Sequence, residues 1–125
     1  MVVLDSNIII DHLRQYPKKS KLREIEEKLP AASLAISIIT VQELYEGKST
    51  REMRREKTLL EVIDSLKILP YTNEIAKVAG QLARDLDRKI EFPDAAIAAT
   101  TILNKAKLFT LNKKDFWGVK GLKLI

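Results

Sequence analysis

Short apolar stretches that alternate with helix-like segments constrain the fold of this chain more than any other feature. The first, VVL at residues 2–4, has apolar side chains at consecutive positions, which is typical of a strand covered on both faces in a parallel sheet. Further strands are predicted at 34–39 (LAISII), 67–70 (KILP), 107–111 (KLFTL) and 122–125 (LKLI). Helices are predicted over about 6–15, 20–29, 40–47, 51–66, 72–86 and 94–106. This alternation predicts an α/β fold, a three-layer α/β/α sandwich with a central, mainly parallel sheet.

The composition limits the kind of protein that this can be. With 125 residues, the chain is long enough for one domain with a real core, so we expect a single domain over residues 1–125. The sequence contains no cysteine, which excludes disulfides and thiolate metal sites and favours an intracellular protein. No signal peptide is recognisable, and no apolar run approaches the roughly 18 residues that span a membrane. We therefore expect a soluble, cytoplasmic protein.

Four acidic residues follow predicted strands. Asp5 comes directly after the first strand, Glu43 is expected to begin the helix after the second, Asp94 to begin the alanine-rich helix, and Asp115 lies just beyond KLFTLN. The carboxyl ends of parallel strands share one edge of the sheet, where ligands bind in α/β folds. We therefore expect three or four of these carboxylates to meet in one pocket.

Helix capping is the alternative interpretation of each acid taken alone. Aspartate is a preferred N-cap, Thr40 and Glu43 match a capping box, and Asn112 with Asp115 repeats the arrangement of N-cap and third helical residue. Taken together, however, clustered carboxylates repel one another unless a cation neutralises them. Hard ions such as Mg²⁺ or Mn²⁺ prefer oxygen ligands of this kind.

The rest of the sequence offers little competing chemistry. The single histidine, His12, is expected to be a packing or surface residue, and no glycine-rich phosphate loop follows VVLD.

The net charge of +5 suits a polyanionic partner such as nucleic acid. Two basic clusters could contribute to binding, although each could also be a solvated helix face. One consists of Lys18, Lys19, Lys21 and Arg23, and the other of Lys48, Arg51, Arg54, Arg55 and Lys57. Acids, a hard metal and a basic surface together fit metal-dependent hydrolysis of a phosphodiester.

Four motifs in order carry a resemblance to a known family. VVLDSNIIID, SIITVQELYEG, FPDAAIAATTI and LFTLNKKDF resemble the PIN-domain ribonucleases, in particular the VapC-type toxins of toxin-antitoxin pairs, across essentially the whole chain. The resemblance implies an α/β/α sandwich, an acidic Mg²⁺ or Mn²⁺ site and endonucleolytic cleavage of RNA. It also implies a homodimer and inhibition by a VapB-like antitoxin, for which the helices of residues 6–29 and 40–66 are candidate groove walls.

The resemblance also assigns roles to individual residues. The family's acids fall on Asp5, Glu43 and Asp94, with Asp115 or Asn112 as the fourth site residue, and we expect Asp115. Asp5, Asp94 and Asp115 would hold the metal, and Glu43 would orient or deprotonate the attacking water. Asn7 and Thr110 match polar positions that line the family's site, although ordinary turn hydrogen bonding is an alternative. Candidates for contact with the RNA backbone are Arg51, Arg54, Arg55, Lys113 and Lys114.

Three other functions stay open at this point. A PIN nuclease could act in RNA processing without an antitoxin. A phospho-acceptor domain of the receiver type also has an acidic Mg²⁺ pocket, but it would need an acid pair after its first strand, where this chain has Asp5 alone. A non-catalytic binding module, with the acids acting only as caps, is the third.

Overall fold

A four-stranded parallel sheet organises the molecule. The computed structural model describes residues 1–125, and its strands lie in the order β3-β2-β1-β4. They are β1 (Val2–Leu4), β2 (Leu34–Ser37), β3 (Lys67–Leu69) and β4 (Lys107–Phe109). All three strand pairs are parallel, and Val3 of β1 lies between Ala35 and Leu108 of its two neighbours. The expected parallel sheet is therefore confirmed.

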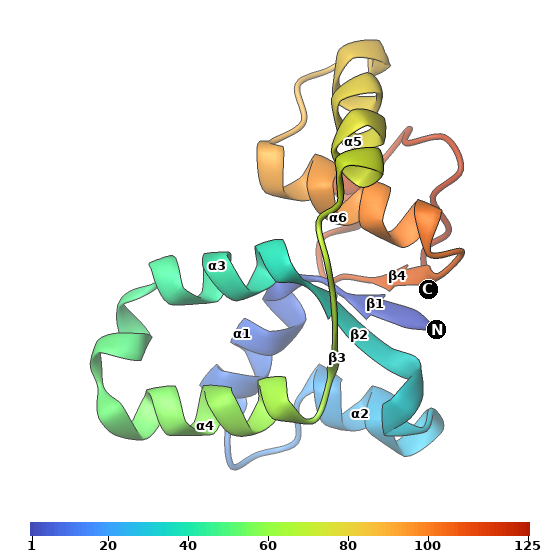
Figure 1. The fold of residues 1–125 in the computed structure, drawn as a ribbon. Coiled ribbons are helices and arrows are strands. Elements are labelled where there is room, and N and C mark those ends of the chain that lie inside the picture. Colours follow the sequence, from blue (N-terminus) through green and yellow to red (C-terminus); the bar gives the residue numbers. More distant parts are fainter.

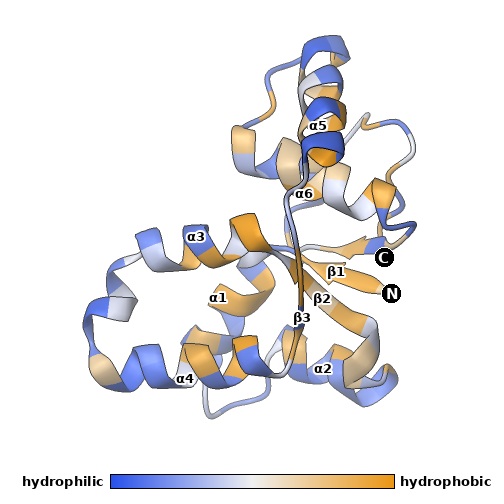
Figure 2. Ribbon diagram, in the orientation of Figure 1, coloured by the Kyte–Doolittle hydropathy of each residue, from blue (hydrophilic) through white to orange (hydrophobic).

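Helices cover both faces of this sheet, as Figure 1 shows. The six α-helices are α1 (Ser6–Gln15), α2 (Lys21–Lys28), α3 (Ile38–Glu46), α4 (Met53–Asp64), α5 (Asn73–Asp85) and α6 (Phe92–Leu103). Helices α5 and α6 lie on one side of the strands, whereas α1, α2 and α4 lie on the other, with α3 running outward from the end of β2. The strands between the two layers are hydrophobic and the outward faces of the helices are mostly hydrophilic (Figure 2). The three-layer α/β/α sandwich is confirmed.

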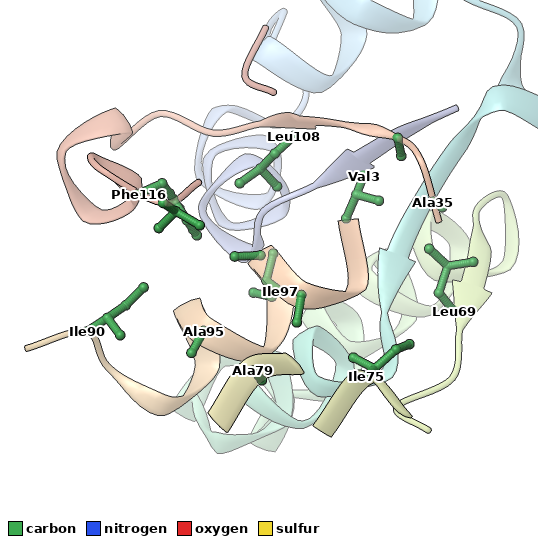
Figure 3. Packing of buried hydrophobic residues seen from close by; sticks show 14 residues of the cluster. Val3, Ala35, Leu69, Ile75, Ala79, Ile90, Ala95, Ile97, Leu108 and Phe116 are labelled. Atoms are coloured by element: carbon green, nitrogen blue, oxygen red, sulfur yellow. The ribbon is translucent and has the colours of Figure 1, made fainter. Parts of the chain in front are cut away.

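The strand periodicity produces two separate cores. Val3 of β1 points into the core beneath α5 and α6, where it packs with Ala35, Ile97 and Leu108 (Figure 3). Its neighbours in sequence point the other way, into the core formed with α1, α2, α3 and α4. Because consecutive strand side chains face opposite sides, VVL has to be apolar throughout, and all three residues are buried.

Two sequence predictions about boundaries are wrong. The second strand ends at Ser37 rather than at residue 39, because the Ser37 hydroxyl accepts a hydrogen bond from the Ile39 amide (3.1 Å) and so caps α3. Thr40 and Glu43 consequently lie inside this helix and form no capping box. The predicted terminal strand at 122–125 is a single bridge between Leu108 and Leu124. The remaining elements lie where the apolar spacing predicts them, with ends shifted by a few residues.

None of the helices combines the length and the hydropathy that a membrane crossing requires.

Dense packing of α6 gives a test of the fold. Ala98 on α6 is fully buried in the core beneath α5 and α6, whereas Ala83 on α5 is exposed. We expect Ala98→Leu to lower the free energy of unfolding by about 1–3 kcal/mol, because extra methyl groups do not fit a filled core. Ala83→Leu, the matched control, should change it by less than about 0.5 kcal/mol. Urea denaturation measures both, and equal effects would contradict the packing described here.

Candidate active site

Asp5 is the buried centre of a group of acids at the carboxyl edge of the sheet. It follows β1 directly, its amide donates to the carbonyl of Phe109 (2.9 Å), and its side chain is only 4% exposed. One carboxylate oxygen accepts from the Ser6 amide (2.8 Å), so that Asp5 caps α1 as the sequence predicts. The other accepts from the Thr110 hydroxyl (2.8 Å). Burial raises the pKa of Asp5, and these hydrogen bonds offset part of the rise.

A small polar network holds Asp5 in place. The Thr110 hydroxyl, which donates to Asp5, accepts from the Asn7 side-chain amide (3.2 Å) and from the backbone amide of Asn112 (3.0 Å). The Asn7 carbonyl oxygen in turn accepts from the backbone amide of Leu111 (3.2 Å). Asn7 and Thr110 therefore lie beside the predicted site and join the start of α1 to the end of β4.

Glu43 reaches the same place from the interior of a helix. It is the sixth residue of α3, so the expectation that it begins this helix is wrong, because Ser37 caps the helix three residues earlier than Thr40. Burial raises the pKa of Glu43 to about 7, and repulsion by Asp5 and Asp94 adds to the rise. One of its carboxylate oxygens is buried without a hydrogen-bond partner. A carboxylate oxygen left in this state costs free energy unless something binds it.

Asp94 comes from the opposite layer. It is the third residue of α6, which begins at Phe92, and the N-cap of this helix is Glu91 rather than Asp94. Burial raises its pKa to about 6, with further contributions from the charges of Asp5 and Asp115. The expectation that Asp94 opens the helix is thus off by two residues, but the side chain does join the other acids.

Asp115 is the fourth acid, and Asn112 lies against it. Asp115 is in a short 3-10 turn, η3 (Lys113–Phe116), and its carboxylate accepts from the Asn112 side-chain amide (2.7 Å). Asn112 precedes the turn as predicted but makes no capping hydrogen bond with its side chain. Since the charge of Asp115 raises the pKa of both Asp5 and Asp94, Asp115 belongs to the same electrostatic group.

The structure adds one residue that the sequence did not suggest. Arg88, in the connection between α5 and α6, donates from one guanidinium nitrogen to the backbone carbonyls of Asp115 (3.0 Å) and Trp117 (2.7 Å). Its positive charge also offsets part of the rise in the pKa of Asp94. No local pattern marks this arginine, because its partners lie 27 and 29 residues further along the chain.

The donor set fits a hard divalent cation. It consists of carboxylates, of which Glu43 and Asp94 have pKa values raised by burial and by the charges of their neighbours. One carboxylate oxygen of Glu43 is also buried without a hydrogen-bond partner. No three of these side chains are close enough to share one ion as they stand. A cation would therefore have to draw the carboxylates together, at a site whose oxygen chemistry suits Mg²⁺ or Mn²⁺ better than zinc.

A family model described as the PIN domain matches residues 2–120. The chain belongs to the PIN-domain family. Ribonuclease VapC10 of Mycobacterium tuberculosis is 34% identical to it over 120 residues, which cover 93% of this chain and 86% of that protein. Ribonuclease VapC1 of Methanocaldococcus jannaschii is 32% identical over 128 residues, which cover 98% and 85%. Membership of this family rules out the receiver-type alternative.

Solved structures agree with this assignment. A chain in the crystal structure of VapBC2 from Rickettsia felis, bound to a promoter DNA fragment, superposes with a TM-score of 0.86 at 26% identity and covers 100% of this PIN domain and 98% of that chain. DNA-bound VapBC from Salmonella typhimurium gives a TM-score of 0.84 at 25% identity, with coverage of 99% and 96%.

The two basic clusters of this PIN domain differ in their surroundings. In the first, Lys19, Lys21 and Arg23 each form a salt bridge with a glutamate, which supports the interpretation as a solvated helix face. In the second, Arg55 also forms a salt bridge, with Glu52, but Arg54 and Arg55 both line a groove of about 970 Å³ that extends to Glu43. Arg51 lies outside this lining, in the 3-10 turn η2 (Lys48–Arg51) that precedes α4. Lys113 and Lys114 belong to the same turn as Asp115.

His12 is a packing residue, as the sequence predicts. It is 1% exposed, and its Nδ1 lies 2.8 Å from the hydroxyl of Ser20, which caps α2. This contact fixes α1 against α2 and gives His12 no part in the acidic site.

Metal-free stability should depend on pH through Glu43. Its pKa rises from 4.5 to about 7 on folding, so the folded state favours the protonated form, and stability falls as pH rises from 4.5 through 7. We expect Glu43→Gln to be more stable than the parent at pH 8 by about 1 kcal/mol, after allowance for solvent screening, and equal to it at pH 4. Urea denaturation in EDTA at both pH values measures this difference.

Glu61→Gln, at an exposed position on α4, is the control and should change little at either pH. A parent that gains stability relative to Glu43→Gln between pH 4 and pH 8 would contradict the electrostatic description of the site.

Proposed function

We propose that this chain is an Mg²⁺- or Mn²⁺-dependent endoribonuclease, the toxin of a VapBC-type toxin-antitoxin pair. The observation that carries this proposal is the convergence of Asp5, Glu43, Asp94 and Asp115 at one edge of a PIN-domain sheet, where burial and the charges of neighbouring carboxylates raise the pKa values of Asp5, Glu43 and Asp94. The curated relatives named above are ribonucleases of the VapC type, and the solved relatives are VapBC complexes.

Three of the four acids would hold the metal. Asp5 offers a carboxylate already fixed by Ser6 and Thr110, whereas Asp94 and Asp115 come from α6 and η3 on its other side. When bound, the ion neutralises these carboxylates, activates water and stabilises negative charge on the phosphate oxygens.

Glu43 would orient the attacking water and take its proton. A general base works best when its pKa lies near the working pH, and the pKa of Glu43 is about 7. One of its carboxylate oxygens has no hydrogen-bond partner within the protein. In this assignment Thr110 and Asn7 are positioning residues, because they contact Asp5 or each other rather than the substrate.

Basic side chains beside the acids would bind the RNA backbone. Arg54 and Arg55 line the groove that leads to Glu43, and Lys113 and Lys114 directly precede Asp115 in η3. Arg51 remains a candidate on η2. Because such contacts release counterions, RNA binding should weaken as the salt concentration rises.

The same groove is the candidate site for a VapB-like antitoxin. Apolar side chains of α1 and α3 line it together with several basic ones, which suits an amphipathic, acidic segment of a partner. The lining includes Ile10, Leu13, Leu44, Arg14, Arg54 and Lys57.

A short reading frame directly upstream, encoding a DNA-binding protein, would support the toxin assignment, and its absence would favour a role in RNA processing. The homodimer and the cytoplasmic location stay predictions.

Substitution of the acids separates catalysis from capping. Asparagine caps a helix about as well as aspartate but brings no negative charge to a metal. We expect Asp5→Asn and Asp94→Asn to fold normally and to lose RNA cleavage by about 100-fold or more, measured with a labelled RNA in Mg²⁺ or Mn²⁺.

Asp64→Asn, at an exposed position on α4, is the matched control and should cleave like the parent. EDTA should abolish cleavage, and Mg²⁺ or Mn²⁺ should restore it. Full activity in EDTA, or in Asp5→Asn, would contradict the metal site.

The fourth site residue can be tested separately. We expect Asp115→Ala to reduce cleavage strongly because it removes a negative charge from the group around Asp5 and Asp94. Asn112→Ala should have a smaller effect, because Asn112 contributes one hydrogen bond to Asp115. Initial rates over a range of Mg²⁺ concentrations compare the two variants, and loss of activity in Asn112→Ala alone would reverse this choice.

A further inference from the structure

The only tryptophan of the chain is exposed beside the acidic site. Trp117 is 75% exposed, although its neighbours Phe116 and Val119 are 2% and 8% exposed and anchor the segment in the core. A large aromatic side chain that remains in water between two buried anchors gives up the favourable free energy of burial. Phe116 and Val119 thus anchor the segment around Trp117 in the core, while the indole stays exposed to solvent.

Trp117 is tied to the acids through its backbone. It directly follows η3, the turn that carries Asp115. The Arg88 guanidinium donates to the carbonyls of both Asp115 and Trp117, and Gly118 turns the chain immediately afterwards with a φ of +81°. The same contacts thus position the backbone of the fourth acid and that of the tryptophan, which lies two residues after Asp115 along the chain.

Three lysines lie near Trp117 in the sequence. Lys113 and Lys114 precede it in η3 and Lys120 follows it, and none of the three forms a salt bridge with a carboxylate. Protein interfaces are typically depleted of lysine, whereas single-stranded nucleic acid is bound by aromatic side chains together with cations that contact the backbone. The charge around Trp117 therefore favours a nucleic acid over a protein partner.

We propose that Trp117 stacks on an unpaired base of a single-stranded RNA whose phosphates contact Lys113 and Lys114. This inference rests on the proposed function and adds to it a base-stacking position beside the acids. Stacking on an aromatic side chain tolerates any base, so Trp117 would select unpaired RNA rather than a particular sequence. A duplex, whose bases are already stacked on one another, would not offer this contact.

Fluorescence tests the stacking directly, because the chain has no other tryptophan. Asp94→Asn, which leaves the RNA intact, is titrated with a short single-stranded RNA and with the same RNA as a duplex. We expect saturable quenching by the single strand and little by the duplex. The anisotropy of a labelled RNA measures binding independently, and binding that is not accompanied by quenching would overturn the proposal. A change in tryptophan emission with protein concentration, in the absence of RNA, would also overturn it, because it would indicate that another protein chain covers the indole.

Variants at the same position measure the contribution of the ring. Trp117→Ala should raise the Kd for single-stranded RNA about tenfold, and Trp117→Phe should recover most of the affinity. In the active protein, Trp117→Ala should raise KM by a similar factor and leave kcat within about twofold. Met53→Ala, at another highly exposed apolar residue, should bind like the parent.

Equal affinity of the parent and Trp117→Ala, or failure of Trp117→Phe to recover binding, would overturn the stacking role. The two proposals fail separately. Quenching by single-stranded RNA without any cleavage by the parent would support the stacking and overturn the nuclease, whereas cleavage without quenching would do the reverse.

Discussion

The site depends on one buried carboxylate, that of Asp5 at the junction of β1 and β4. Its backbone amide continues the sheet toward Phe109, and its side chain accepts hydrogen bonds from Ser6 and Thr110. Because Asp5 is 4% exposed and cannot turn away from the acids that approach it, its charge acts on Glu43 and Asp94 through little water. Burial raises the pKa values of these two residues, and the fixed charge of Asp5 adds to the rise.

Helix capping does not explain why these acids converge. Asp5 caps α1, but Glu43 lies inside α3, and Asp94 is in the first turn of α6, whose N-cap is Glu91. A fold that only needed capping would not bring these residues together, since their repulsion opposes folding in the absence of a cation. The unpaired oxygen of Glu43 adds to this cost. The arrangement is favourable when the site binds a positive ion.

The strand–helix junctions predict most of the site, since Asp5 directly follows a short apolar strand and a parallel sheet gathers such positions at one edge. Thr110 is expected only from the family resemblance, because the predicted strand runs past it to residue 111, whereas β4 ends at Phe109. The start of α3 was predicted incorrectly because Ile38 and Ile39 continue an apolar run, so that only the Ser37 hydroxyl marks the end of the strand. Arg88 could not be predicted at all. Its contacts join the α5–α6 connection to η3, and they exist only once both layers have packed.

The positions of the basic side chains suggest a path for the substrate. The groove lined by Arg54 and Arg55 approaches the acids from the side of Glu43, whereas Lys113, Lys114 and Trp117 lie on the side of Asp115. A polyanion that contacted both sides would have to cross the carboxylates, where its charge would be repelled unless a cation lay between them. The same metal would then resolve the repulsion among the acids and the repulsion between the acids and the phosphates. RNA binding and metal binding should therefore strengthen each other in this site. The cation reduces the repulsion between the carboxylates and the phosphates, and the phosphates add negative charge that attracts the cation.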